Sequence, residues 1–282
     1  NYKKSFEDVN KIIDNKNIQK FICNIDKNIK IIGTTHTGKV FHVNWESNIH
    51  NDYKLDNKNL GNIDPNEIIN FHSIKKSLKN YLCILSSDGK FKKVFFDQDM
   101  IKSNRSFTVT RLKNDIKIID SFIFSNEEKN LIILTSIGRI FKFNLSNNIL
   151  VPNTKQSQGL LLAKLLPTEK IVSCCPFKNG ENIYLISQQG KIFYINSDEI
   201  YYANECNLGY LNDKTQLKND YFLKIITSDH YLDIETNKNK SARLDFNKLT
   251  FKSNKTYFIT DLLNLGADER IENCYRLEKL FN

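Results

Sequence analysis

Basic side chains recur beside tight turns along this sequence. One follows the turn residue in each of five hairpin-like segments: Lys39, Lys90, Arg139, Lys191 and Lys240. Three of these segments carry a second cation three residues later, namely Lys93, Lys142 and Arg243. Cations at regular spacing suit the phosphates of a polyanion, which they bind without reading its sequence. A lysine beside a turn equally suits ordinary solvated surface, where it discourages edge-to-edge strand pairing.

The loops that follow the hairpins add further cations. The second repeat carries Arg105, Arg111 and Lys113, and the third carries Lys155. A guanidinium presents a planar pair of donors to phosphate, and the chain has only six arginines, so each arginine is more informative than a lysine. We expect some arginines to pair with nearby carboxylates instead. The candidate phosphate-binding set is Lys39, Lys90, Lys93, Arg105, Arg111, Lys113, Arg139, Lys142, Lys155, Lys191, Lys240 and Arg243.

Other reactive residues show no arrangement that predicts catalysis. The five histidines and six cysteines have no metal-ligand spacing, and no C-x-x-C pair occurs. Neither a nucleophile elbow, a Walker A loop nor a dinucleotide fingerprint is present. We therefore predict no catalytic residue, no metal and no cofactor in this chain. The cysteines sit in apolar strands and are interpreted as reduced core thiols in a reducing compartment.

The composition favours a soluble protein with a polyanionic partner. The formal net charge is +9, and excess cations on a surface lower the free energy of approaching phosphate. Lysine far outnumbers arginine, however, and abundant Asn and Ile are also what an AT-rich genome produces, so charge alone leaves the partner open. No apolar run approaches the length of about 18 residues that a membrane helix needs, and no charged-then-apolar leader is visible. We expect a soluble segment of a longer protein.

The hairpin turns recur with a fixed period. The turn residues are Gly38, Gly89, Gly138, Gly190 and Asn239, at spacings of 51, 49, 52 and 49 residues. A short hairpin turn needs positive φ, which Gly reaches without strain and Asn tolerates. A third β-rich strand follows each turn, at Ile68-Ile69, Ile118-Ile119, Ile171-Val172, Ile225-Ile226 and Ile271.

A period of this length, filled with strands, predicts stacked sheet units that bury their faces against neighbours. We predict an all-β, propeller-like ring forming one domain over residues 1–282. Its five complete blades would span residues 25–76, 77–126, 127–178, 179–228 and 229–282, and residues 1–24 would form a partial sixth, with Ile18–Ile22 in the place of a third strand. Trp45 and the strand phenylalanines are expected to pack between blades.

The third repeat carries a longer motif. In order it contains Leu134–Phe143, Ile149–Pro152, Lys155, Gly159, Leu165–Pro167 and Glu169–Ile171. This series resembles a blade of the C-terminal domain of the gyrase and topoisomerase IV A subunits, which are type II DNA topoisomerases. The resemblance implies a β-pinwheel whose blades exchange strands, and it implies that duplex DNA bends around the basic outer edge. The candidate phosphate-binding set then becomes a DNA-binding set.

The resemblance also implies parts that this chain lacks. The family's cleavage tyrosine lies in an Arg-Tyr-Thr context that none of the twelve tyrosines here matches, so the chain alone is not an enzyme. Magnesium, ATP, the homodimer of A subunits and the ATPase B subunit belong to the parent isomerase, which acts in the cytoplasm at the nucleoid or, alternatively, in a plastid-type organelle. The gyrase Gln-Arg-Arg-Gly-Gly-Lys-Gly box is absent. Either it precedes residue 1, or the chain is a topoisomerase IV-like or divergent form that wraps DNA weakly.

Two other function classes compete. A propeller scaffold for protein partners, as in kelch-type rings, usually shows Gly-Gly pairs and tryptophans, whereas this chain has one Trp and no such pair. A propeller enzyme would need acidic or metal-binding residues converging on the axis. The location of Lys and Arg on the folded ring separates these hypotheses.

Overall fold

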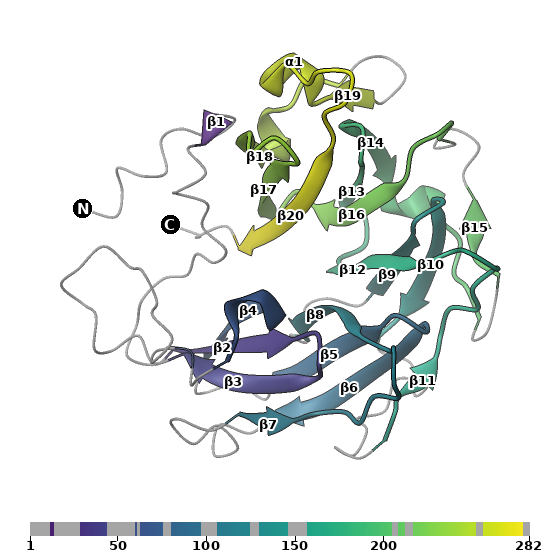
Figure 1. Ribbon diagram of the computed structural model, residues 1–282. Helices are drawn as coiled ribbons and strands as arrows, with labels where there is room; N and C mark the ends of the chain where they lie inside the picture. Colours follow the sequence, from purple (N-terminus) through teal and green to yellow (C-terminus); the bar gives the residue numbers. More distant parts are fainter. Residues whose placement is uncertain are drawn as a thin grey trace.

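The chain forms a ring of β-sheets (Figure 1). The computed structural model describes residues 12–13, 29–43, 60, 63–75, 80–96, 106–124, 130–145, 157–204, 208–211, 217–251 and 256–278. These residues form five four-stranded antiparallel sheets. Helix in the described part is limited to α1 (Thr260–Leu263) and the short 3-10 turns Pro65–Glu67, Ser197–Glu199 and Phe246–Lys248. The predicted all-β ring of five complete blades is confirmed.

The centre of each sheet is a hairpin of two consecutive strands. Around the ring these are β2 (Ile29–Thr35) with β3 (Lys39–Val43), β5 (Asn80–Ser86) with β6 (Lys90–Phe96), β9 (Asn130–Thr135) with β10 (Arg139–Asn144), β13 (Asn182–Ser187) with β14 (Lys191–Asn196), and β17 (His230–Thr236) with β18 (Ser241–Asp245). The four predicted turn glycines have φ between 80° and 92°, and Asn239 has φ 59°. The interpretation of the turn residues is therefore confirmed.

A hydroxyl residue holds each turn. In the first hairpin, the N–H of Gly38 donates to the carbonyl of Thr35 (3.0 Å), and the N–H of Lys39 donates to Oγ1 of the same Thr35 (3.0 Å). The second bond recurs from Arg139 to Thr135 and from Lys191 to Ser187. The side-chain oxygen satisfies a backbone donor that a tight turn leaves unpaired, and it fixes where the next residue, the cation, leaves the backbone.

The inner strands surround the axis of the ring (Figure 1). They are β4 (Ile68–Lys75), β8 (Ile118–Phe124), β12 (Ile171–Phe177), β16 (Phe222–Thr227) and β20 (Ile271–Glu278), each paired with the first strand of its hairpin. Every one carries a register shift at its second residue, where two residues face one. The predicted Ile225-Ile226 lie within the inner strand of the fourth sheet, which begins at Phe222.

The outer strands come from the following repeat. After each hairpin, the chain crosses back to the preceding sheet and adds a short strand at its outer edge: β7 (Phe107–Thr108) on β3, β11 (Leu160–Leu161) on β6, β15 (Tyr210–Leu211) on β10, and β19 (Thr256–Phe258) on β14. The fifth sheet receives β1 (Ile12–Ile13) on β18. The N-terminal segment thus supplies what a sixth repeat would supply. The predicted strand Ile18–Ile22 lies outside the described residues.

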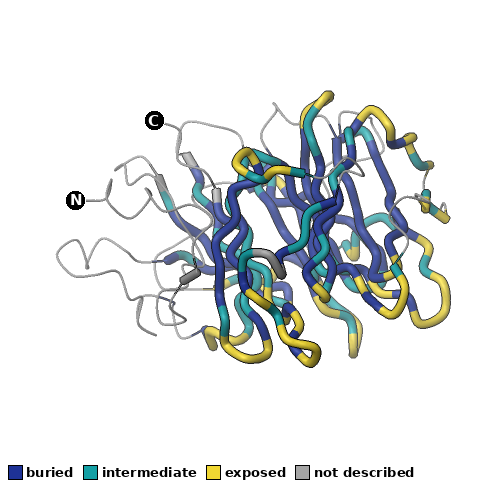
Figure 2. Tube along the Cα trace, turned by 90° about the horizontal axis from the view of Figure 1, so that it is seen from above, coloured by how far each residue is buried: buried dark blue, intermediate teal, exposed yellow. Residues whose placement is uncertain are grey.

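The core lies between adjacent sheets, where buried side chains of neighbouring blades interlock. Phe91 and Phe122 of the second blade pack in one cluster with Leu131 and Phe141 of the third. Burying each such Phe stabilises the fold by about 1.5–3 kcal/mol. Figure 2 shows the strands largely buried and the loops exposed. The packing role predicted for the strand phenylalanines is confirmed, whereas Trp45 lies outside the described residues.

The cysteines of the described part are free thiols. Cys83, Cys174 and Cys175 are buried, and Cys274 is half-buried. Burial raises the pKa of Cys175 to about 11 and that of Cys274 to about 12. Such thiols are poor nucleophiles, so their role is packing. Cys23 and Cys206 lie outside the described residues.

Candidate nucleic-acid interface

The cations that follow the turns divide into two groups. Lys39 is exposed, while Lys90 and Lys191 are half-buried. Lys90 pairs with Asp88 within its own turn (Nζ–Oδ2 2.7 Å) and donates to the side chain of Gln158 (3.2 Å). These three ammonium groups lie where a ligand approaching from solvent could reach them.

The other two each pair with a glutamate from the same blade. Arg139 is buried, and its Nε donates to Oε1 of Glu169 (2.7 Å) while Nη2 donates to the second carboxylate oxygen. Lys240 pairs with Glu269 (Nζ–Oε2 2.7 Å). Burial by itself would raise the pKa of Glu169, but the hydrogen bonds from Arg139, Leu166 and Thr135 together with the Arg139 charge hold that pKa below its ordinary value. Both carboxylates lie two residues before an inner strand of the same sheet.

The second cations of the hairpins are buried. Residues three apart on a strand lie on opposite faces, so Lys93 cannot join Lys90 on one surface. The ammonium of Lys93 lies 4.2 Å from the ring centre of Phe124, and that of Lys142 lies 4.4 Å from that of Tyr202. Lys142 also donates to the carbonyl of Ser197 (2.9 Å). Burial lowers the pKa of both lysines.

Arg243 is the third cation of this kind. It forms a bidentate pair with Asp233 on the adjacent strand, with both N–O distances 2.7 Å. Such a fork fixes the orientation of the guanidinium, and the residue is only 9% exposed. Lys93, Lys142 and Arg243 are therefore part of the packed interior, and a DNA phosphate could reach them only after a rearrangement.

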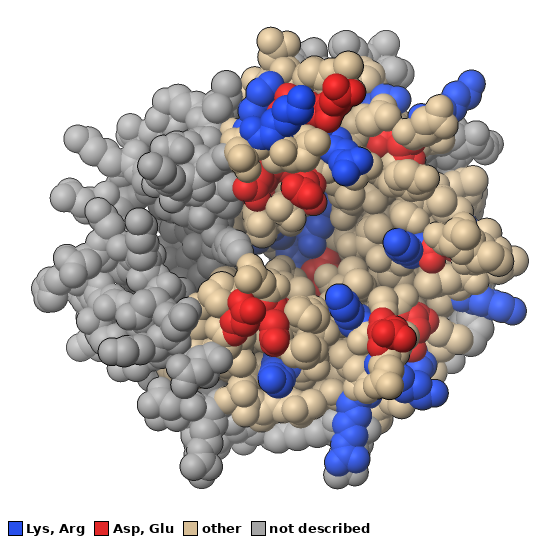
Figure 3. Space-filling view, viewed as in Figure 1, with Lys and Arg blue, Asp and Glu red and all other residues tan. Residues whose placement is uncertain are grey.

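The connector between β7 and β8 carries exposed cations. Arg111, Lys113 and Lys117 are exposed there, and Lys164 and Lys170 are exposed on the corresponding connector of the next repeat. Arg105 and Lys155 lie outside the described residues. On the face drawn in Figure 3, Lys and Arg alternate with Asp and Glu and do not form an unbroken basic band.

A polar cluster on the ring axis was missed by the sequence analysis. Asn70, Asp120, Ser173 and Lys224 occupy the same place in four inner strands, each opposite the penultimate residue of its hairpin's first strand. The carboxylate of Asp120 accepts from the other three side chains, at 2.8 Å from Asn70, 2.8 Å from Ser173 and 3.0 Å from Lys224. The available signal was a polar residue two positions after the start of each third strand, at spacings of 50, 53 and 51.

The fifth blade joins this cluster through a different residue. Its equivalent position, Asn273, is exposed, and Arg276 instead extends inward. The guanidinium donates to the carbonyls of Ser121 (2.9 Å) and Cys174 (3.3 Å), and it lies 3.9 Å from the carboxylate of Asp120. Two cations, Lys224 and Arg276, thus share the carboxylate of Asp120, and the guanidinium also donates to two backbone carbonyls. The cluster ties all five blades at the axis.

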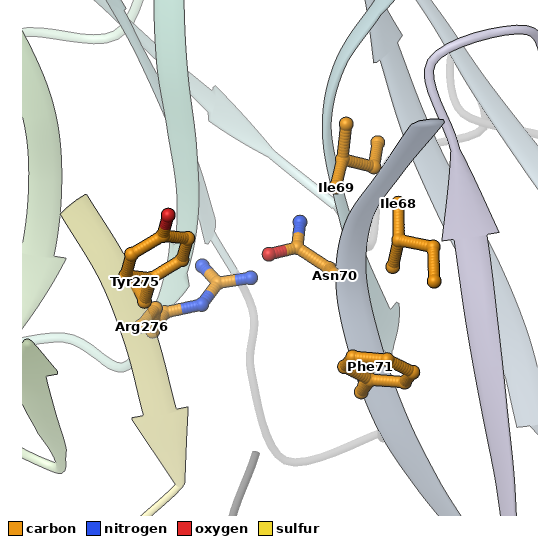
Figure 4. Close-up of a pocket in the computed structure, with 6 residues that line it drawn as sticks. All are labelled: Ile68, Ile69, Asn70, Phe71, Tyr275 and Arg276. Carbon is orange, nitrogen blue, oxygen red and sulfur yellow. The ribbon is translucent and has the colours of Figure 1, made fainter. Parts of the chain in front are cut away.

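The described residues of the first and last blades enclose a small hollow. A hollow of about 10 Å³ lies between β4 and β20, lined by Ile68, Ile69, Asn70, Phe71, Tyr275 and Arg276 (Figure 4). That volume holds about one water molecule. Figure 4 shows Arg276 and Asn70 pointing toward each other across it. Within the described ranges, no three His, Cys, Asp or Glu side chains gather to hold a metal, and no helix is long and apolar enough to span a membrane.

A ring in which each sheet takes its outer strand from the following repeat is a β-pinwheel. This chain has the fold of the C-terminal domains of type II topoisomerase A subunits. The C-terminal domain of a DNA topoisomerase IV superposes with a TM-score of 0.69 at 16% identity, over 90% of this chain and 80% of that one. A DNA gyrase A C-terminal domain superposes with a TM-score of 0.66 at 17% identity, over 90% of this chain and 84% of that one.

The E. coli ParC C-terminal domain is also similar, with a TM-score of 0.55 at 13% identity over 90% of this chain and all of that one. No protein-family profile and no curated protein sequence matches the chain. At this level of identity, the likeness establishes the fold. It assigns no binding residue.

Proposed function

We propose that this ring binds duplex DNA through its backbone phosphates, without sequence preference, and bends it. The ring would serve as the non-catalytic C-terminal domain of an ATP-dependent type II topoisomerase A subunit that controls DNA supercoiling. The observation that carries the proposal is the strand-exchanged ring, which matches topoisomerase IV and gyrase A domains over 90% of the chain. Cleavage, Mg²⁺, ATP, the A-subunit dimer and the B subunit would belong to the parent enzyme in the cytoplasm or a plastid-type organelle.

The surface charge supports this reading. The net charge is +9, and Lys39, Arg111 and Lys113 are exposed on the first two blades. Exposed cations attract a polyanion, and each phosphate that they neutralise releases counterions into solution. The neutralised Arg139 and Lys240 contribute less to such a surface. An incomplete basic edge favours binding with partial bending, because curving DNA around the whole ring costs several kcal/mol, on the order of 1–6 for a short site.

Salt dependence tests the proposal. If roughly five to eight phosphates are neutralised, a plot of log affinity against log salt for a duplex should have a slope of about −4 to −7, at roughly −0.9 per contact. Duplexes of different sequence should give the same slope and similar affinities. A chain that fails to bind duplex DNA even at low salt would overturn the proposal.

A second function is favoured by one surface feature. Tyr201, Tyr202, Leu208 and Leu211 are exposed at 78%, 53%, 53% and 41% beside the outer edge of the third sheet. The rings of Tyr201 and Tyr210 are 6.2 Å apart, which places Tyr201 beside the strand that carries Leu211. Contiguous exposed apolar side chains suit a protein partner. A protein scaffold is therefore the alternative, and it would replace DNA binding if the salt experiment fails.

A further inference from the structure

We propose that one phosphate of the DNA backbone is held in a hollow on the second blade, between Lys90, Arg111, Lys113 and Gln158. This inference rests on the proposed function and names the place where contact is strongest. The hollow is lined by these four residues together with Ser86, Asp88, Leu112 and Ile116. Its volume of about 10 Å³ fits one water-sized atom, so it suits a single phosphate oxygen.

The backbone that presents Arg111 and Lys113 is fixed at both ends. At the start of the connector, the N–H of Val109 donates to the carbonyl of Gly38 (2.9 Å) on the first blade. At its end, Ser87 and Lys117 exchange two hydrogen bonds: N–H to carbonyl at 2.8 Å, and N–H to Oγ at 3.1 Å. The two cations therefore extend from a pinned segment, which lowers the entropy that a ligand must remove.

The charge around the hollow is positive. Three cations face one carboxylate, Asp88, which is already bound to Lys90 (2.7 Å) and to the hydroxyl of Ser86 (2.5 Å). Burial would raise the pKa of Asp88, but hydrogen bonds from Lys90 and Ser86 keep that pKa below its ordinary value, so the Lys90–Asp88 pair is neutral. Arg111 and Lys113 then supply an unbalanced charge of two. An arginine fork beside a lysine is the donor set that binds phosphate oxygens well.

Gln158 adds a neutral donor. Its side-chain oxygen accepts from Lys90 (3.2 Å), which leaves the two N–H bonds of the amide for an incoming acceptor. Gln158 precedes β11, which completes the second sheet from the third repeat. The hollow therefore combines side chains from two sequence repeats, so its geometry depends on the strand exchange.

The next exposed cation continues the path onto the first blade. Lys39 pairs in register with Thr108 of β7, three residues before Arg111. In the third and fifth blades, by contrast, the cations that follow the turn form ion pairs with glutamates. These pairs are Arg139 with Glu169 and Lys240 with Glu269. Lys191 of the fourth blade is half-buried, whereas Arg111 and Lys113 add two exposed cations beside Lys90 and Lys39. Phosphate contact would therefore concentrate on the first two blades.

The test compares two charge reversals of equal size. Arg111→Glu with Lys113→Glu changes the hollow, and Lys218→Glu with Lys248→Glu changes two exposed lysines on later blades. Binding of a fluorescent duplex of about 40 base pairs would be measured by anisotropy at several salt concentrations, and circular dichroism would check that each variant folds. We expect the Arg111→Glu, Lys113→Glu variant (the hollow variant) to bind at least about tenfold more weakly at 0.1 M salt. Its slope of log affinity against log salt should shrink in magnitude by about two, and both changes should be clearly smaller in the control.

A conservative variant separates fork geometry from charge. Arg111→Lys should keep the salt slope but lose affinity by a few-fold, because an ammonium cannot make the paired bonds of a guanidinium. Equal losses in the hollow variant and the control would overturn the hollow while leaving DNA binding by the ring intact. No binding by the unmodified chain would instead overturn the proposed function, and the hollow with it.

Discussion

Lys224 donates a hydrogen bond to Asp120 (3.0 Å) at the centre of the ring, although 104 positions separate the two residues along the chain. The carboxylate is fully buried, and Lys224 is nearly so. Asp120 comes from the second blade and Lys224 from the fourth, so the bond closes the ring across its axis. Attraction between two charges is strong in such an interior, but it stabilises the fold only while both partners are present.

Removal of the central carboxylate should therefore destabilise the ring. Asp120→Asn keeps the shape of the side chain but leaves Lys224 and Arg276 buried without their counter-charge. We expect the free energy of unfolding, measured in urea, to fall by about 3–5 kcal/mol. Asp120→Asn combined with Lys224→Met should recover part of this loss. A double variant as unstable as the sum of the two single variants would contradict a direct coupling.

Acid should weaken the same region through His72. Burial, and then the nearby Arg276 charge, lower the pKa of His72 from 6.5 to about 3, and its Nε2 lies 2.9 Å from the hydroxyl of Ser121. The unfolded chain takes up this proton near pH 6.5 and the folded chain only near pH 3, so stability should fall as pH decreases between these values. His72→Gln should flatten this part of a stability–pH curve measured by urea unfolding. A curve for His72→Gln that falls as steeply between pH 6.5 and pH 3 as that of the unmodified chain would refute the assignment.

Two glycines with similar positive φ allow the effect of backbone strain to be distinguished from that of a steric clash at the added Cβ. Gly89 (φ +81°) has the carbonyl oxygen of Ala163 2.2 Å from the position a Cβ would take, whereas Gly180 (φ +76°) has no atom within 4 Å of that position. Gly180→Ala should lower the free energy of unfolding by about 1 kcal/mol, because alanine is strained in the left-handed conformation. Gly89→Ala should lower the free energy of unfolding by at least about 2 kcal/mol more than Gly180→Ala does, because its Cβ must displace the backbone of Ala163. Thermal unfolding of both variants would show the difference, and matching melting temperatures would argue against it.

Arg139 should prove structural. Arg139→Gln leaves Glu169 buried without its partner, so we expect a loss of about 3–5 kcal/mol in the free energy of unfolding and no change in the salt slope of DNA binding. Lys39→Gln is the matched comparison at an exposed turn: its stability should stay within about 0.5 kcal/mol and its salt slope should shrink by about one. A reduced slope for the arginine variant would return Arg139 to the DNA-binding surface.

The sequence predicted the parts of the fold that repeat in residue type. Gly38 and Asn239 marked turns because positive φ restricts the residue, and the aliphatic pairs marked third strands because burial restricts them. The outer strands are only two or three residues long and lie in polar loops, too short for any periodicity. Their exchange was implied by the resemblance and not by the residues. Gly159 and Gly209, each directly before an outer strand, were the local signal.

The candidate site was less predictable because charge partners are set by tertiary structure. The hairpin pattern gave the position of Arg139 but not the approach of Glu169, which is 30 residues away in sequence. Alternation along the strand would have placed Lys93 on the face opposite Lys90, and that step was available from sequence alone. The meeting of Asp120 with Lys224 required the ring to be closed, and no local rule contains it.

The exchange of outer strands also bears on how such a ring could grow. Each sequence repeat completes the sheet before it and leaves its own sheet to be completed by the repeat after it. Copying one stretch of about 50 residues in register would therefore insert a blade and leave every internal edge paired. Copying one geometric sheet would require two separate pieces of the gene. The unit that gene duplication would copy is thus a sequence repeat that joins two neighbouring blades. One such duplication would change the number of blades in the ring by one.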